Sequence, residues 1–307
     1  MSISVVVIAK NSADIILKNL KSVQFADEVI LVDIKSTDET KKIAKKHCSK
    51  IYDYERDSRF VEPVRNYALE KATKDWILVL DADEEIPSSL AKKLQEIDQQ
   101  NLGDVYYLPR KNMVSKAWMK HTGWWPDYQL RFFKKGLVSW GSKIHGKAQV
   151  ADSYKTSVLE AQEEMAILHH NYKDTKDYLF RFDRYTDIEA EQKASELGEK
   201  FSISQSTLLK AFSDDWFRRF FAKEGYKDGV RGFYLSLMQA AYQMTVQMKI
   251  FDRLDNQKNL EADNQQNLIR DLRHFQKELN YWMNDLEIKQ KKGLSRFWIS
   301  VKRKLSL

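Results

Sequence analysis

The stretch from Trp76 to Glu85, WILVLDADEE, constrains the fold more than any other part of the chain. Five large apolar residues, Trp76 to Leu80, are followed directly by acidic residues at positions 81, 83, 84 and 85. An apolar run of this length, bounded by polar residues, is typical of a strand that is buried on both faces of a parallel sheet. The stretch therefore predicts an α/β fold with acids at the carboxyl end of a strand, where open sheets of this kind bind ligands.

The acidic pair Asp81 and Asp83 has two interpretations. Where a strand turns into a loop, both carboxylates can point toward one hard cation, so the pair predicts a Mg²⁺ or Mn²⁺ site of the kind that also binds substrate phosphates. The alternative is an ordinary acidic start of a helix, because Pro87, Ser88 and Ser89 resemble a helix N-terminus. An Asp-x-Asp triplet alone is a weak motif. The strand that precedes it favours the metal site.

The first hundred residues alternate between strand-like and helix-like patterns. Such alternation predicts βαβ units, a mostly parallel sheet and right-handed crossovers, which is a nucleotide-binding architecture. The expected strands are 3–8, 29–32, 51–54 and 76–80, and the expected helices are 14–23, 37–47 and 61–72.

Polar side chains follow two other expected strands. Asn11 comes after the first strand, and Asp33 comes at the end of the second. An acid in the second position can accept hydrogen bonds from a base or a ribose, so both residues are candidate ligand contacts. The stretch 36–38 also has the sequence of a helix N-cap, and both interpretations can hold together. No glycine-rich loop follows either strand, which argues against a dinucleotide or P-loop site.

The stretch from residue 104 to residue 150 loses the helical period and is crowded with Gly, Pro, Trp and His. Short aromatic strands are predicted here. Tryptophans near His121, together with Asp127, Arg131 and His145, suggest a site lined by rings and a few charged groups, which suits sugars and phosphates. The alternative is a small aromatic core for a mixed sheet.

The C-terminal half is predicted to be helical. Residues 174–209 form a charged helix that we expect to pack on the first domain. Gln239, Gln243 and Gln247 recur every four residues and draw a polar stripe on an otherwise apolar helix, which predicts a helical hairpin or a helix lying on a membrane. Residues 256–288 form a charged helix with an apolar seam, which we expect to pack on the same hairpin or on a second chain.

The last nineteen residues, 289–307, contain basic residues and no acid. Their apolar residues fall on one helical face, which is the pattern of an interfacial helix on anionic lipid. A solvated basic tail is the alternative. The seven basic residues are Lys289, Lys291, Lys292, Arg296, Lys302, Arg303 and Lys304.

Charge and cysteine content restrict the partners and the compartment. The formal net charge is +7 and the pI is about 9.1, which favours nucleotide phosphates, an anionic membrane or nucleic acid as partners. The single cysteine, Cys48, excludes an intrachain disulfide and a cysteine-cluster zinc site, so we expect a reducing compartment. The N-terminus MSISVVVIAKN lacks the basic region and cleavage site of a signal peptide, which predicts a cytoplasmic protein.

Several stretches taken in order resemble a known family. They are VVVIAKN, ADEVILVDIKSTDET, EPVRNYALEKATKDWILVLDADEEI, GWWPDYQLRFFKKG, IHG, ILHHNY and WFRRFFAKEGYKDG. Together they resemble bacterial GT-A glycosyltransferases of family 2, in particular the branch similar to lipopolysaccharide-core β-1,4-glucosyltransferases. The resemblance runs from Ile3 to Phe251 and is most specific between Ala26 and Phe133. It implies a GT-A domain over residues 1–210. From the patterns of the C-terminal residues we expect a helical, membrane-associating region over residues 211–307.

The resemblance implies a site, residue by residue. Asp33 would hold the uracil or ribose of a nucleotide-sugar donor, and Arg65 would lie by the nucleotide. Asp81 and Asp83 would form the metal-binding motif for Mg²⁺ or Mn²⁺. The remaining roles fall in the aromatic stretch and at the first strand: Asp127 would be the catalytic base, Arg131 would lie beside the phosphates, His145 would neighbour a phosphate or the metal, and Asn11 would contact the donor.

The chain departs from the family pattern at three places. Ile34, Lys35 and Ser36 replace the usual Ser-Gly-Ser, Ser12 replaces a Glu, and Gly146 replaces the Glu expected after His145. These departures concern the identity of the donor more than the reaction.

The resemblance and the residues together predict an inverting, metal-dependent hexosyltransferase. It would transfer a sugar, from a UDP-hexose, to a lipid-linked or envelope glycan, working at the cytoplasmic surface of the inner membrane without a nucleic-acid partner. Two alternatives stay open at this point: a nucleotidyltransferase, and a non-catalytic adaptor that binds membrane or nucleic acid.

Overall fold

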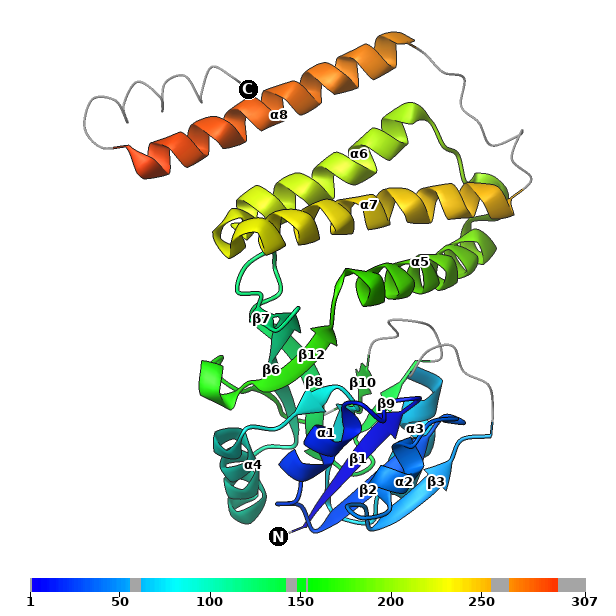
Figure 1. Cartoon of the computed structure of the whole chain (residues 1–307), viewed down its shortest axis with the longest axis vertical. Coiled ribbons are helices and arrows are strands. Elements are labelled where there is room, and N and C mark those ends of the chain that lie inside the picture. The colour runs from blue at the N-terminus through cyan, green and yellow to red at the C-terminus, as the bar shows by residue number, and fades with distance from the viewer. Residues whose placement is uncertain (1, 56–61, 142–147, 153, 255–264, 292–307) are drawn as a thin grey trace. The chain divides into compact units, whose positions relative to one another are not determined.

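The computed structural model describes residues 2–55, 62–141, 148–152, 154–254 and 265–291 (Figure 1). The chain divides into two compact units. The first comprises Met1–Lys120 and Trp124–Asp174, and the second comprises His121–Gly123 and Thr175–Leu307. The compact units thus divide after Asp174, whereas the sequence placed the domain boundary at residue 210, and that boundary stays a prediction.

The first unit is built on a mixed sheet with the strand order β3-β2-β1-β4-β8-β6-β12-β5, and β7 and β11 also pair with β6. A second, two-stranded sheet joins β9 and β10. The predicted α/β fold of GT-A type is confirmed. The strands are β1 (Ile3–Ala9), β2 (Glu28–Asp33), β3 (Lys50–Asp53), β4 (Trp76–Asp81), β5 (Glu84–Glu85), β6 (Val105–Val114), β7 (Ala117–Trp118), β8 (Asp127–Lys134), β9 (Val138–Trp140), β10 (Ala148–Val150), β11 (Thr156–Val158) and β12 (Ile167–Tyr172).

Helices cover both faces of the parallel half of this sheet. In β1, Val5 and Val7 pack in one core cluster with residues of the helices α1, α2 and α4, whereas Val6 and Ile8 pack in another with residues of α3. Because neighbouring side chains of a strand point to opposite faces, a strand buried on both sides is mostly apolar, as β1 is apart from Ser4 and β4 is up to Leu80. The helices are α1 (Ile16–Ser22), α2 (Thr40–Ala44), α3 (Glu62–Lys71) and α4 (Ser88–Gln100).

The aromatic stretch forms strands, as predicted. Strand β8 pairs antiparallel with both β4 and β6, which extends the parallel half of the sheet. Its residue Phe132 is fully buried and stacks on Trp76 of β4 with 4.6 Å between ring centroids. The aromatic core that the sequence left as an alternative therefore exists, on residues other than the polar ones of the candidate site.

The acids after β4 do not belong to the first turn of a helix. Helix α4 does begin at Ser88, with Pro87 before it, but its first turn contains no acid. Instead Glu84 and Glu85 form the short strand β5, which pairs antiparallel with β12. The alternative interpretation of the acidic run as a helix start was therefore wrong, although the helix itself was placed correctly.

The second unit is helical. Its main elements are α5 (Thr175–Leu197), α6 (Gln205–Trp216), the π-helical turn η3 (Phe217–Ala222), α7 (Gly229–Arg253) and α8 (Gln265–Gln290); short 3-10 turns lie at Glu163–Met165 in the first unit and at Gly198–Lys200 and Gly225–Asp228 in the second. The expectation that helix α5 packs on the first domain stays a prediction. The aromatic face of α5 packs on α7: Tyr178 contacts Tyr234, and Phe182 contacts Tyr242.

The two later helices pack on neighbours within the second unit. In α7 the first glutamine of the stripe, Gln239, donates a hydrogen bond of 3.0 Å to the Tyr178 hydroxyl, so this position faces α5. The seam of α8 contacts the aromatic turn η3 through Phe275 and Trp282. No helix in the described part of the chain combines the length and apolarity that crossing a membrane requires.

Candidate functional site

The parallel strands bring the predicted polar residues to one edge of the sheet. Asp33 and Asp81 end β2 and β4, which flank β1 in parallel register. Asn11 joins the loops after β1 and β2: its backbone N–H donates to Ser36 Oγ at 2.8 Å, and its Oδ1 accepts from the Thr37 N–H at 2.8 Å. The structure therefore places Asn11, Asp33 and Asp81 at neighbouring strand ends, as expected.

Asp33 is fully buried but only partly hydrogen-bonded. Its Oδ2 accepts from the Ser36 N–H at 2.8 Å, whereas its Oδ1 is buried and has no hydrogen-bond partner among the described residues. A buried acceptor without a donor costs about 1–3 kcal/mol. Asp33 Oδ1 is therefore a buried acceptor that can still take one N–H or O–H donor.

Asp81 is held by two arginines. Its Oδ2 accepts from Arg131 Nη2 at 2.6 Å, and Arg65 Nη2 lies 3.2 Å from both carboxylate oxygens. Burial alone would raise the pKa of Asp81, but the charges of Arg131 and Arg65 outweigh it and hold the pKa below the ordinary value. The carboxylates likewise raise the pKa of Arg131 despite its burial, so this group stays charged.

Glu84 links Asp81 to the next strand. Its side chain is fully buried, and its Oε1 accepts from Arg131 Nη2 at 2.8 Å and from Arg110 Nη1 at 2.9 Å. Arg110 lies on β6, where it is the register partner of Asp127 on β8. A continuous chain of charged hydrogen bonds therefore runs from Asp81 through Arg131, Glu84 and Arg110 to Asp127.

Asp127 receives several donors. Its Oδ2 accepts from Arg110 Nη2 at 2.7 Å, Arg110 Nε at 2.9 Å and Asn112 Nδ2 at 2.9 Å, and its Oδ1 accepts from Gln129 Nε2 at 2.7 Å. Burial would raise the pKa of Asp127, but the charge of Arg110 and these hydrogen bonds hold it below the ordinary value of 3.8. The side chain is 26% exposed, so this ionised carboxylate can meet a ligand.

A second polar chain runs from Asp127 toward Asp83. The Asn112 amide, 2% exposed, contacts both Asp127 and His169, whose Nδ1 lies 2.6 Å from Asn112 Oδ1. On the other side of the ring, His169 Nε2 lies 3.6 Å from Asp83 Oδ1. The predicted base, Asp127, and the predicted metal ligand, Asp83, are thus connected through the two buried side chains of Asn112 and His169.

Comparison with known sequences identifies the family. The sequence model of glycosyl transferase family 2 matches residues 4–162, just over half of the 307-residue chain. The chain belongs to glycosyl transferase family 2. It is therefore an enzyme, and the alternative of a non-catalytic adaptor was wrong.

Individual relatives of this family 2 glycosyltransferase are distant. An uncharacterized glycosyltransferase of Rickettsia conorii is 24% identical over 253 residues, which cover 78% of this chain and 86% of the relative. Another, of Rickettsia felis, is 35% identical over 111 residues, 34% of this chain and 36% of that protein. This chain therefore matches about a third of the second relative.

Among solved structures, TarS of S. aureus is 16% identical with a TM-score of 0.43, over 81% of this chain and 55% of TarS. The mannosyltransferase PcManGT of Pyrobaculum calidifontis, solved in complex with GDP-Man and Mn2+, is 17% identical with a TM-score of 0.42, over 79% of this chain and 73% of that chain. The match thus spans about half the length of TarS.

A divalent cation, which the resemblance implies, fits one pair of side chains in this transferase. No group of three or more His, Cys, Asp and Glu side chains within the described residues is arranged to hold a metal. Asp81 is engaged by two arginines, and Asp83 and His169 form a pair of suitable ligand types. An ion about 2.1 Å from each of two atoms spans at most about 4.2 Å, so their separation of 3.6 Å fits. Mg²⁺ is commonly held by one or two protein ligands and completed by phosphates and water.

Sequence reasoning missed Glu84, Arg110, Asn112 and His169 as functional residues. Glu84 was noted only as part of the acidic run, and His169 only within ILHHNY. Arg110 and Asn112 are two residues apart on β6, so they point to the same face. Polar residues alternating in a strand with buried neighbours were the signal that could have found them.

The sequence also singled out two other histidines. His121 belongs to the second unit, where its Nδ1 lies 2.8 Å from Asp228 Oδ1 and its backbone N–H donates to Asp228 Oδ2 at 2.8 Å. The grouping of His121 with the aromatic site stays a prediction. His145 lies outside the described residues, so its role stays a prediction.

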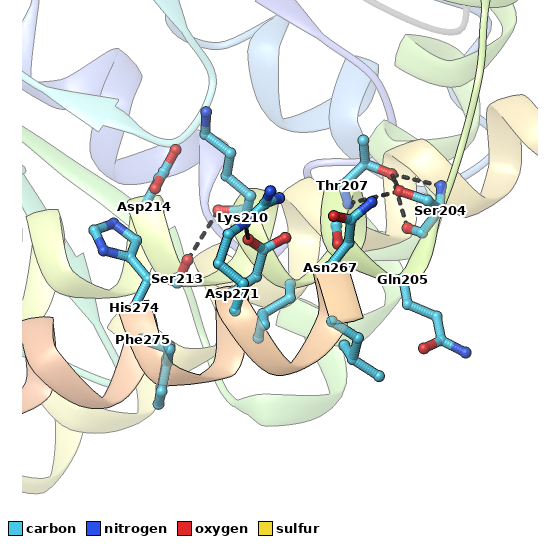
Figure 2. A pocket seen from close by; sticks show the side chains of 14 residues that line it. Ser204, Gln205, Thr207, Lys210, Ser213, Asp214, Asn267, Asp271, His274 and Phe275 are labelled. Carbon is cyan, nitrogen blue, oxygen red and sulfur yellow. Dashed lines mark hydrogen bonds and ion pairs between the residues drawn. The ribbon is translucent and has the colours of Figure 1, made fainter. Parts of the chain in front are cut away.

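The second unit contains a pocket of about 400 Å³ between α6 and α8 (Figure 2). Lys210, Arg270 and His274 line it, but so do Asp214 and Asp271, so its charge is mixed. The capping bonds between Ser204 and Thr207 use the polar groups at the start of α6. This pocket lacks the buried arginines and unpartnered carboxylate oxygen of the site in the first unit, and we assign it no role.

Proposed function

We propose that this family 2 enzyme is an inverting hexosyltransferase that uses a nucleotide-sugar donor, a UDP-hexose, and a hydroxyl of a lipid-linked or envelope glycan as acceptor. The observation that carries the proposal is the continuous charged chain from Asp81 to Asp127. It joins a strand edge suited to a nucleotide diphosphate with a separate, ionised and partly exposed carboxylate. Such a pairing supplies the two things that direct sugar transfer needs, a stabilised leaving group and a base.

The donor would bind at the ends of β2 and β4. Asp33 Oδ1 would accept a hydrogen bond from the base or ribose, because it is buried without a partner. Arg65 and Arg131 would face the diphosphate, and the Nε atoms of both side chains are buried without a hydrogen-bond partner among the described residues. Arg65 also lies over the Trp140 ring at 5.4 Å, which fixes its guanidinium plane.

Asp127 would act as the base. The acceptor hydroxyl attacks the anomeric carbon, the bond to the diphosphate oxygen breaks, and the hydroxyl proton passes to an oxygen of Asp127. A single displacement of this kind inverts the anomeric carbon and needs no covalent intermediate on the enzyme. Arg110 and Asn112 would hold the carboxylate in one orientation during transfer.

Asp83 and His169 would hold the divalent cation. When bound, the cation neutralises negative charge on the departing diphosphate. Asp81, which the sequence also assigned to the metal, would instead orient Arg65 and Arg131 toward the donor. His145 is retained in the proposal as a phosphate or metal neighbour.

For the acceptor, we propose a glycan of the lipopolysaccharide core or a related envelope polymer, reached at the cytoplasmic surface of the inner membrane. The resemblance of the chain between Ile3 and Phe251 to the core glucosyltransferase branch supports this proposal, and so does the one-sided charge of residues 289–307. A basic amphipathic segment would hold the enzyme at the surface where lipid-linked acceptors lie.

The metal proposal predicts that Asp83→Asn loses Mn²⁺-dependent UDP binding, by at least about tenfold in Kd, while the fold survives. The reason is that a neutral amide is a much weaker ligand for a hard cation than a carboxylate. Calorimetric titration of UDP, with Mn²⁺ and with EDTA, measures the effect. Glu39→Gln, which changes a carboxylate that is 64% exposed, is the matched control. Equal Mn²⁺-dependent affinity in Asp83→Asn and wild type would refute the role of Asp83.

The membrane proposal predicts that deleting residues 292–307 releases the enzyme from anionic vesicles without changing UDP binding in solution. Each of the five deleted basic residues contributes about 1 kcal/mol near such a surface. The deletion leaves α8 intact, including the 3.0 Å ion pair between Lys289 and Asp285. Co-sedimentation with vesicles of anionic and of neutral lipid is the measurement. If both forms sediment equally with anionic vesicles, another part of the protein binds the membrane.

A further inference from the structure

The orientation of one buried amide, that of Asn112, is fixed by its neighbours. Its Nδ2 lies 3.2 Å from the Trp124 carbonyl oxygen and 2.9 Å from Asp127 Oδ2. A carbonyl and an ionised carboxylate only accept hydrogen bonds, so the amino group must be the end that faces them. Asn112 Oδ1 is therefore the atom that faces His169 Nδ1 at 2.6 Å.

This orientation determines which ring nitrogen of His169 carries hydrogen. An amide oxygen cannot donate, so Nδ1 must be the protonated nitrogen in this contact. In the neutral ring the other nitrogen, Nε2, then carries a lone pair. That lone pair faces Asp83 Oδ1 at 3.6 Å, which is too far for a hydrogen bond.

We propose that Asn112 is a positioning residue that holds His169 in its Nδ1–H tautomer, so that Nε2 and Asp83 together bind the divalent cation, while the same amide orients Asp127. The inference rests on the proposed function, because it assigns the tautomer a purpose at the proposed metal site. Asn112 touches neither the cation nor the substrate, and it acts through His169 on one side and through Asp127 on the other.

The sheet builds this arrangement from its register. Asn112 on β6 is the direct partner of His169 on β12, and Arg110, two residues earlier on the same face, is the partner of Asp127 on β8. Strand β6 lies between the other two in the sheet. The side chains of one strand therefore connect the base on one neighbouring strand with the proposed metal ligand on the other.

The adjacent histidine supplies an internal reference. His170 Nε2 lies 2.5 Å from Glu85 Oε1, so in a neutral ring its hydrogen is on Nε2, the opposite nitrogen from that in His169. Neighbouring residues of a strand point to opposite faces, which explains why two consecutive histidines meet such different partners. The two rings are expected to show opposite tautomers in one spectrum.

The first test is NMR of the wild-type protein without metal, labelled with ¹⁵N-histidine, at a pH where both rings are neutral. We expect His169 to show a protonated Nδ1 and a lone pair on Nε2, and His170 to show the reverse. His170→Gln assigns the second ring. A hydrogen on Nε2 of His169, alone or together with one on Nδ1, would overturn the proposal, and this measurement needs no variant of Asn112.

The second test separates the two contacts of Asn112 with a pair of variants. Asn112→Leu removes both, and we expect it to weaken Mn²⁺ binding about 10–100-fold, the range typical of outer-shell changes at metal sites. Asn112→Asp keeps an acceptor for His169 Nδ1 but loses the donor to Asp127, so Mn²⁺ binding should be retained while turnover falls. Calorimetric titration with Mn²⁺ alone measures the affinity. Wild-type Mn²⁺ affinity in folded Asn112→Leu would overturn the proposal, and so would equal losses of affinity in both variants.

These measurements distinguish failure of this inference from failure of the proposed function. If Asp83→Asn abolishes Mn²⁺ binding but His169 carries its hydrogen on Nε2, only the role of Asn112 falls. If the tautomer is as expected but the protein binds no Mn²⁺, the proposed metal site is refuted. The inference is then refuted as well, because the tautomer would have no cation to serve.

Discussion

Asp127→Asn is expected to lower turnover by about 10²–10⁴-fold while leaving UDP-sugar affinity unchanged. The amide keeps the shape of the carboxylate but cannot take a proton. Because the lowered pKa keeps Asp127 ionised well below neutral pH, the wild-type base should stay available at pH 5 to 8. Steady-state turnover and calorimetric affinity for the same donor are the two measurements.

The control for this variant is Asp104→Asn. Asp104 precedes β6 and pairs with Lys134 at 2.9 Å, at the opposite end of the strand from the Asn112 side chain, so its loss should leave turnover unchanged. Two results for Asp127→Asn would contradict the prediction: a fall in turnover of less than tenfold, or a fall in affinity that matches the fall in turnover. Either would show that Asp127 is a binding or structural residue and not the base.

Arg131→Met is expected to destabilise the protein by about 3–5 kcal/mol, the usual result of removing one partner from a buried charge network. Arg131 is 2% exposed, and its removal leaves Asp81 and the fully buried Glu84 with fewer cations. Methionine fills a similar volume, so the effect reports charge rather than a cavity. Urea unfolding at pH 7 measures the loss.

The effect of Arg131→Met on stability should depend on pH. The pKa of Asp81 is lowered in the folded protein, so its ion pairs add stability above the ordinary aspartate pKa, and this stability is lost as the pH falls through the lowered value. In Arg131→Met, protonation of Asp81 removes the charge that has lost its partner. The difference in unfolding free energy between the variant and the wild type should therefore shrink at acid pH. Arg270→Met, on an exposed arginine of α8, should change stability by less than about 0.5 kcal/mol. An equal, small change in both variants would contradict the prediction.

The sequence allowed prediction of those features that depend on local pattern. The run Trp76 to Leu80 specifies a strand buried on both faces, and the order of strands and helices specifies the parallel half of the sheet. The positions of Asp33 and Asp81 at neighbouring strand ends could be predicted from this order, because residues at the carboxyl ends of parallel strands meet at one edge of the sheet. The same reasoning placed Asp127 and Arg131 in a polar site, although it could not say what held them.

Features that depend on long-range register could not be predicted. Arg110 meets Asp127, and Asn112 meets His169, only because β6 pairs with β8 and β12 in one particular register. A shift of one residue would turn these side chains to the other face of the sheet. A single sequence contains no record of that register. The same limit applies to the charged helix α5, whose contacts with α7 the sequence did not predict, since an aromatic face fits any apolar partner.

The position of β12 in the sheet has a consequence for cutting the enzyme into pieces. The family match ends at residue 162, but β12 follows it at Ile167–Tyr172 and lies between β6 and β5. A fragment trimmed to the family match would keep β11 beside the start of β6 but would remove the partner of β6 from Arg110 to Val114. Unpaired edges of this kind invite association between chains. The smallest piece fit for expression therefore extends through Tyr172, ten residues past the limit that sequence similarity suggests.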